Sequence, residues 1–206
     1  MIAIVDYGVG NLHSILGAVK TIEEDAWVTG DKAAIRNAAG IILPGVGAFG
    51  DAAKKLFDTG LADEIILRAK AGVPMMGVCL GMQLLFEKSF EYGEHAGLAL
   101  LKGEIAPMAD DLKARVKVPH MGWNELEIVK DSMLTKYINT GDYVYYVHSF
   151  YAKNISSLSA QSEYGGIQIP GIVADANVFG CQFHPEKSGQ KGLDILRAFC
   201  EVTKTC

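Results

Sequence analysis

The sequence has few cysteines, and their spacing is not that of a metal or redox site. Cys79, Cys181, Cys200 and Cys206 include no C-x-x-C pair, and none lies at zinc-finger spacing from a histidine or another cysteine. In a reducing compartment they should be free thiols, and most cysteines of this kind are small buried hydrophobes. The sequence therefore predicts no bound metal and no other cofactor.

A surplus of positive charge and a long apolar run are missing as well. The chain has 19 Lys and Arg against 24 Asp and Glu, so its net charge is -5 and it offers no basic surface to nucleic acid or anionic lipid. No apolar stretch approaches the roughly 20 residues that span a bilayer. The N-terminal residues 1–6 lack the basic start and the cleavage site of a signal peptide. We expect a cytoplasmic protein without a membrane or nucleic-acid partner.

What the chain does have is enough apolar side chains for one compact domain. Half of its 206 residues are hydrophobic, which suits a sizeable core. No internal repeat, low-complexity tract or linker divides the sequence. We therefore expect a single domain that spans residues 1–206.

Apolar periodicity predicts an α/β fold. Strand-like runs alternate with helical patterns in the first half, and this order is typical of βαβ units around a parallel sheet. The second half is mostly strand-like, so antiparallel additions to the sheet are expected there. The fold class is thus three-layer α/β with a mostly parallel central sheet. The predicted strands are 2–5, 26–28, 40–43, 74–78, 115–118, 124–129, 143–147, 168–174 and 178–183, and the predicted helices are 11–24, a short one capped by Asp31, 61–71, 82–86 and 193–202.

Cys79 differs from the other cysteines because of its neighbours. Residues 77–81 read Gly-Val-Cys-Leu-Gly, after an apolar strand and before a helical run, which is the cysteine form of the nucleophile elbow. The sharp turn brings strand and helix so close that only glycine fits at Gly77 and Gly81. A thiol at the start of a helix is favoured as the thiolate by the helix dipole. The N–H of Leu80 would point at a developing oxyanion.

His184 is the best candidate for the base that such a nucleophile needs. It follows an apolar strand, and catalytic groups gather at the carboxyl ends of strands in open α/β sheets. Pro185 ends the strand, and Glu186 is placed to orient the imidazole as the acid of a triad does. His120 and His148 also adjoin strands and remain alternatives, whereas the other two histidines, His13 and His95, are expected to be exposed or solvated.

These motifs resemble a known family. Residues 77–83 (Gly-Val-Cys-Leu-Gly-Met-Gln) and 182–186 (Gln-Phe-His-Pro-Glu) are similar to the class I glutamine amidotransferases. Further segments resemble, within that family, the glutaminase subunits of imidazole glycerol phosphate synthases of histidine biosynthesis. These segments are residues 6–11, 44–49, 119–124, 146–149 and 184–189, so the resemblance covers essentially the whole chain.

The resemblance implies a reaction and a role for each matching residue. Cys79 would attack the side-chain amide of glutamine, giving a thioester and ammonia, with His184 as acid/base and Glu186 as its orienting partner. The N–H of Val46 would join Leu80 in the oxyanion hole, and the glycines beside Val46 would let its peptide flip between an inactive and an active state. Glutamine would be held by Gly47, Gln83, Ser149 and Phe150.

Two of these positions carry qualifications. Phe150 stands where the family commonly has tyrosine, so a hydroxyl contact is lost while the backbone can still bind substrate. Gln83 lies one helical turn beyond Cys79, and its alternative interpretation is a solvated helix residue.

The resemblance also implies a partner, a separate (β/α)₈-barrel cyclase that receives the ammonia and forms a heterodimer with this chain. Asn11, Trp123 and Lys187 would face that subunit. Without the resemblance, Trp123 would be a plausible core residue and Lys187 a solvated charge.

Several alternatives stay open. Residues 45–50 fit G-x-G-x-x-G, but the segment follows the third strand and comes after Pro44, which disfavours a dinucleotide site. Another class I glutaminase, such as a pyridoxal phosphate synthase subunit, an inactive regulatory subunit, and a partner-independent cysteine hydrolase are the rival functions.

Overall fold

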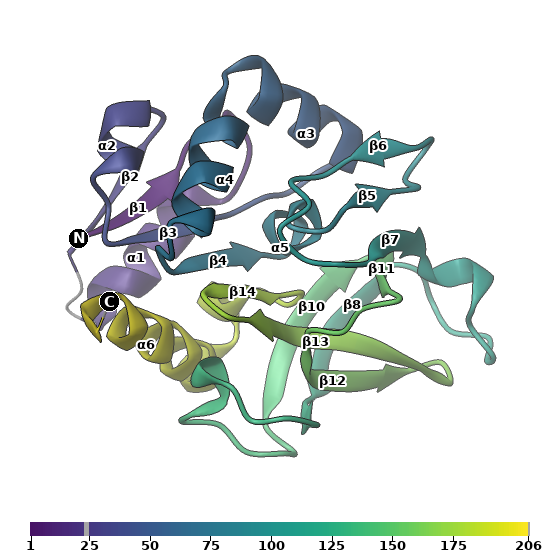
Figure 1. Ribbon diagram of the computed structural model, residues 1–206. Helices are drawn as coiled ribbons and strands as arrows, with labels where there is room; N and C mark the ends of the chain where they lie inside the picture. Colours follow the sequence, from purple (N-terminus) through teal and green to yellow (C-terminus); the bar gives the residue numbers. More distant parts are fainter. Residues whose placement is uncertain (23–24, 206) are drawn as a thin grey trace.

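The computed structural model describes residues 1–22 and 25–205, and in it a large sheet lies between two layers of helices (Figure 1). The sheet has eight strands in the order β2-β1-β3-β4-β14-β13-β12-β9. The first five are parallel to one another, and the last three join them antiparallel. This confirms the predicted mostly parallel sheet with antiparallel additions.

The parallel strands are short, and all except the edge strand β2 are buried along their whole length, as expected where helices cover both sides of a sheet. They are β1 (Ile2–Val5), β2 (Ala26–Thr29), β3 (Gly40–Leu43), β4 (Met75–Val78) and β14 (Val178–Cys181). The helices are α1 (Leu12–Thr21), α2 (Lys32–Arg36), α3 (Phe49–Asp58), α4 (Leu61–Lys70), α5 (Leu80–Leu84) and α6 (Gly189–Thr205).

Alternation along β1 shows how the two core layers form. Ile2 and Ile4 point to the side where α1 and α6 pack, whereas Ala3 and Val5 point to the side of α2, α3 and α4. Successive side chains of a strand face opposite sides of the sheet, so β1 contributes side chains to both core layers. Asp31 caps α2 as predicted, because its carboxylate accepts the N–H of Ala33 at 3.0 Å.

The chain after α5 adds further strands around one end of the sheet. β13 (Ile167–Asp175), β12 (Leu158–Tyr164) and β9 (Glu127–Ile128) extend the central sheet. β8 (His120–Glu125) and β10 (Tyr143–His148) form an antiparallel pair. This pair lies at the carboxyl end of the central parallel strands (Figure 1). A small sheet contains β11 (Phe150–Lys153), β7 (Glu104–Pro107), β5 (Lys88–Ser89) and β6 (His95–Ala96), and the 3₁₀ turns are η1 (Met108–Asp110), η2 (Met133–Thr135) and η3 (Pro185–Lys187).

Five predicted elements need correction. The helix predicted at 82–86 is α5, which begins at Leu80 and ends at Leu84. The predicted strand at 115–118 is wrong: its alternating pattern lies on an exposed segment that no strand pairs with. The predicted strand at 124–129 is split between β8 and β9. The predicted strand at 178–183 is β14, which ends at Cys181, two residues earlier than predicted. The last helix is longer than predicted and begins at Gly189. Part of the predicted helix 11–24 lies outside the described residues. Within the described chain, no helix is long and apolar enough to cross a membrane.

Candidate active site

Cys79 occupies the turn between β4 and α5, as the elbow motif predicts. Its φ is +54°, in the left-handed region that side chains rarely adopt. A Cβ at Gly81 would lie 1.8 Å from the carbonyl oxygen of Leu43, and one at Gly77 would lie 2.6 Å from that of Gly81. These distances confirm that both positions need glycine, because the backbones of strand and helix meet there.

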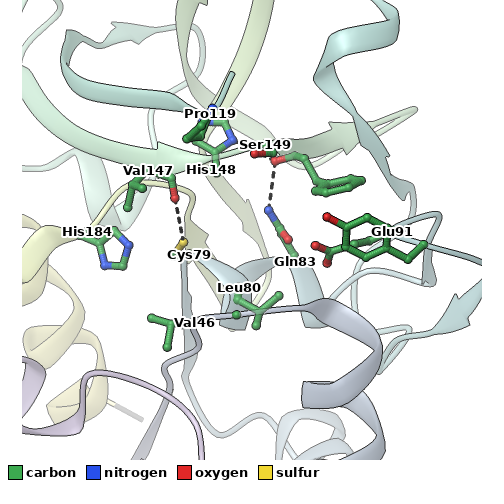
Figure 2. Close-up of a pocket in the computed structure, with 13 residues that line it drawn as sticks. Val46, Cys79, Leu80, Gln83, Glu91, Pro119, Val147, His148, Ser149 and His184 are labelled. Carbon is green, nitrogen blue, oxygen red and sulfur yellow. Dashed lines mark hydrogen bonds between the residues drawn. The ribbon is translucent and has the colours of Figure 1, made fainter. Parts of the chain in front are cut away.

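His184 lies at the end of the neighbouring strand β14 and turns its ring toward Cys79 (Figure 2). Nδ1 of the ring is 2.8 Å from Oε1 of Glu186, so the other ring nitrogen is left for the sulfur. The Glu186 side chain is only 1% exposed, and its second oxygen, Oε2, is buried with no hydrogen-bond partner. The structure thus brings the three predicted triad residues together.

The electrostatics of this group favour a charged imidazole. Burial by itself lowers the pKa of His184, but hydrogen bonds to Cys79 and Glu186 and the negative charges of both raise it, and the net result is a pKa of about 9. An imidazolium beside a sulfur anion is the arrangement that cysteine nucleophiles use.

A cavity of about 340 Å³ opens above Cys79, and most of the predicted site residues line it (Figure 2). It is the size of a small-molecule site. In the part of the chain that the structure describes, no three His, Cys, Asp or Glu side chains gather to hold a metal. The lining residues are Val46, Gly47, Cys79, Leu80, Gln83, Glu91, Tyr92, Pro119, Val147, His148, Ser149, Phe150 and His184.

The loop after β3 forms one wall of this cavity. Its start is held by the buried hydroxyl of Tyr7, which donates to the carbonyl oxygen of Pro44 at 2.8 Å. Val46 is 42% exposed, and Gly47 has a φ of +93° with open space where a Cβ would be. Leu80 at the start of α5 faces the same cavity. The two predicted oxyanion donors are therefore on adjacent walls.

Gln83 is not the solvated helix residue that its sequence position allowed. Its side chain is buried, and Nε2 donates to the carbonyl oxygen of Phe150 at 3.1 Å and to Oε1 of Gln182 at 3.0 Å. Ser149 and Phe150 follow β10 and form the opposite wall. The four predicted glutamine-binding residues all reach one cavity.

Glu91 is a lining residue that sequence reasoning missed. Its carboxylate accepts the N–H of Phe49 at 2.6 Å and so holds the first turn of α3. Burial raises the pKa of Glu91, although the hydrogen bond from Phe49 opposes this. A carboxylate in this wall can attract a cationic group. Because Glu91 comes from a loop without a motif, only its position in space reveals it.

His148, which lines the cavity, forms a buried, neutral pair with His120. His148 donates from Nδ1 to the carbonyl oxygen of Phe150 at 2.8 Å, so its Nε2 accepts from Nδ1 of His120 at 3.0 Å. Nε2 of His120 then accepts from Asn124 at 3.3 Å. Burial lowers the pKa of His120 to about 4 and that of His148 to about 3. The alternative that either is the base is disfavoured.

The three predicted partner-facing residues lie outside the cavity. Trp123 on β8 is 55% exposed and packs edge-on against Tyr145, so the core alternative is wrong. Lys187 in η3 is exposed, and Asn11 precedes α1, which packs against η3.

Comparisons with known proteins agree with this geometry. The model of the class-I glutamine amidotransferase family matches residues 3–202. A protein of Caldanaerobacter subterraneus subsp. tengcongensis, called imidazole glycerol phosphate synthase subunit HisH, is 50% identical over 206 residues, which cover 99% of each chain. A Lactococcus lactis protein of the same name is 47% identical over 97% of this chain and 98% of its own.

Solved structures show the same fold at lower sequence identity. A glutamine amidotransferase crystal structure superposes with a TM-score of 0.77 at 19% identity, covering 99% of this chain and 100% of its own. The PurLQS structure from Thermotoga maritima gives a TM-score of 0.71 at 20% identity, covering 98% of this chain and 97% of its own. The chain belongs to the class I glutamine amidotransferase family, and it has that family's three-layer fold. Its full-length relatives carry the name of a synthase subunit.

Proposed function

We propose that this chain is the glutaminase subunit of a two-protein imidazole glycerol phosphate synthase in L-histidine biosynthesis, acting in the cytoplasm. It hydrolyses L-glutamine to L-glutamate and ammonia. The observation that carries the proposal is the Cys79, His184 and Glu186 group beside a cavity of about 340 Å³. The identity of 50% with a relative of the same length and that name agrees with it.

The chemistry follows from the arrangement of the triad. The Cys79 sulfur attacks the amide carbon of glutamine, and the C–N bond breaks as His184 gives the departing nitrogen a proton, which releases ammonia. A water molecule then gives its proton to His184 and attacks the thioester, and the C–S bond breaks to yield glutamate. The N–H groups of Val46 and Leu80 stabilise the oxyanion of each step. Glu186 keeps the imidazole in the required tautomer.

Binding of glutamine involves the walls of the cavity. Gly47, Gln83, Ser149 and the backbone of Phe150 hold the substrate. Glutamine carries an α-ammonium group, and Glu91 is the acidic side chain among the lining residues that can neutralise it. Phe150 lacks a hydroxyl, so its contribution comes from its backbone and ring.

The partner is a cyclase subunit of (β/α)₈-barrel form that makes imidazole glycerol phosphate and aminoimidazole carboxamide ribonucleotide with the ammonia. Free ammonia is protonated in water near pH 7, so direct transfer between subunits protects its reactivity. We propose that Asn11, Trp123 and Lys187 contact the cyclase and that the two chains form a heterodimer. Trp123 suits this role as an exposed aromatic side chain.

The test is glutamine hydrolysis by the chain alone, with the cyclase, and with the cyclase and its nucleotide substrate. We expect a rise at each step, because the peptide at Val46 would complete the oxyanion hole only in the complex, and one missing donor costs about 10²–10³-fold in rate. Cys79→Ala should abolish activity in all three states, while Cys200→Ala, at a position that does not line the cavity, should retain the stepwise rise.

Each rival predicts a different result. Constant high activity without a partner would support a free hydrolase and overturn the gated loop. Activation by a different synthase, with none from the cyclase, would support another glutaminase. No turnover, and no labelling of Cys79 by a glutamine-analogue warhead in the full complex, would indicate a regulatory subunit.

A further inference from the structure

The carbonyl oxygen of Phe150 determines the orientation of two glutamine side chains. It lies 3.1 Å from Nε2 of Gln83, and a carbonyl oxygen only accepts, so Gln83 must turn its NH₂ group toward it. The same Nε2 is 3.0 Å from Oε1 of Gln182. Because an amide NH₂ only donates, Gln182 must present its oxygen to Gln83. The NH₂ group of Gln182 is therefore directed the other way.

That NH₂ group points to the sulfur of Cys79. Nε2 of Gln182 is 3.8 Å from Sγ, and Gln182 is completely buried. The backbone that precedes Gln182 is held against Cys79, because the N–H of Cys79 donates to the carbonyl oxygen of Cys181 at 2.8 Å. An N–H directed at sulfur stabilises the thiolate relative to the thiol.

The sulfur also has a hydrogen-bond acceptor within reach. Sγ is 3.9 Å from the carbonyl oxygen of Val147, to which an S–H group would donate (Figure 2). The contact with Val147 thus suits the thiol, whereas the contact with Gln182 suits the anion. Cys79 is only 7% exposed, so little water can solvate that anion and protein donors must replace it.

We propose that Gln182 is a further catalytic residue, whose side-chain N–H stabilises the sulfur anion before attack and again when the thioester breaks. Gln83 is then also a positioning residue, since it holds the Gln182 amide in the orientation that presents N–H to sulfur. The inference rests on the proposed role of Cys79 as the nucleophile. The Gln182 side chain belongs to the motif at 182–186, in which sequence reasoning assigned it no role.

The experiment is the pH profile of Cys79 alkylation by iodoacetamide in the full-length chain, which needs neither glutamine nor partner. Gln182→Met keeps the length of the side chain but removes the donor. We expect the midpoint of its profile to move up by about one pH unit, because a hydrogen bond to an ion is worth roughly ten-fold or more in an equilibrium. Gln168→Met, the same change at an exposed position on β13, should leave the profile unchanged. Cys79→Ala gives the background from other cysteines.

A second pair of variants tests the positioning role. Gln83→Met leaves the Gln182 amide present but no longer fixes its orientation. The midpoint of Cys79 alkylation in this variant should therefore move in the same direction as in Gln182→Met, by a smaller amount. The double variant should match Gln182→Met alone, since Gln83 acts on the sulfur through Gln182. Additive shifts would overturn the positioning role, because they would show that the two side chains act independently.

The outcomes separate this inference from the proposed function. Failure of iodoacetamide to label Cys79 in the unmodified chain would count against the nucleophile itself. Normal labelling with the same midpoint in Gln182→Met would overturn the role of Gln182 alone. If Gln182→Met does not fold, Gln83→Met decides, and an unchanged midpoint in that variant overturns the inference.

Discussion

At the scale of single residues, burial and the contacts with Cys79 and Glu186 together set how readily His184 keeps its proton. In the proposed mechanism the ring is protonated when ammonia leaves. Burial lowers the pKa of His184, but its contacts with Cys79 and Glu186 outweigh this and raise the pKa to about 9. The rate should therefore fall as pH rises through about 9, where the imidazolium is lost.

Glu186→Gln removes the negative charge but keeps an oxygen for Nδ1. We expect the alkaline limb of kcat/KM in the assembled enzyme to move to lower pH by about one unit, with kcat/KM reduced at least about ten-fold, because the imidazolium loses a buried counter-charge. The check is kcat/KM for glutamine against pH, which reports the groups of the free enzyme. Glu94→Gln, at an exposed carboxylate paired with Lys88, should leave the limb in place. An unmoved limb in Glu186→Gln would show that another group limits the rate.

At the scale of elements, the site depends on the close approach of β3, β4 and α5. Gly81→Ala would place a methyl group 1.8 Å from the carbonyl oxygen of Leu43, so the helix must shift away from the sheet. We expect a loss of stability of about 1–3 kcal/mol and loss of activity, measured by urea unfolding and glutamine hydrolysis. Gly17→Ala on the exposed side of α1 meets open space and should stabilise by about 0.5–1 kcal/mol. Equal stability of the two variants would contradict this account of the elbow.

At the scale of the whole molecule, we propose that residues 1–206 fold as one domain. The β8 and β10 pair is joined to the central sheet, since the Tyr146 hydroxyl lies 2.9 Å from that of Ser162 and the N–H of His184 donates to the carbonyl oxygen of Tyr145 at 2.9 Å. The two parts should therefore unfold together.

The two tryptophans offer a direct check of that cooperativity. Trp27 lies on β2 in the central sheet, and Trp123 lies on β8. In urea, the fluorescence of Trp27→Phe and Trp123→Phe should each report a midpoint that coincides with the circular dichroism of the same variant. A separate, earlier transition seen only by Trp123 would show that the β8 and β10 pair is an independent unit.

Short-range patterns in the sequence were sufficient for much of the fold and for selecting the three proposed triad residues, which the structure places together. The parallel strands, the cap at Asp31 and the elbow at Cys79 depend on periodicity and on turn chemistry between near neighbours. His184 and Glu186 are two residues apart, and their contact is local. The same local evidence was wrong at 115–118, because a strand also needs a neighbour to pair with, and that segment has none.

What the sequence by itself determined, then, is which residues can carry the chemistry and the turns that present them. Only the tertiary structure decided which groups surround them. Glu91 binds Phe49 at the start of α3, 42 positions away in the sequence, and Gln182 contacts the sulfur of Cys79, 103 positions away. Such contacts arise when sheet order and helix packing bring distant backbone segments together, and no local pattern encodes them. The direction of the Gln182 amide depends on two tertiary contacts in series, because the carbonyl oxygen of Phe150 orients Gln83 and Gln83 orients Gln182.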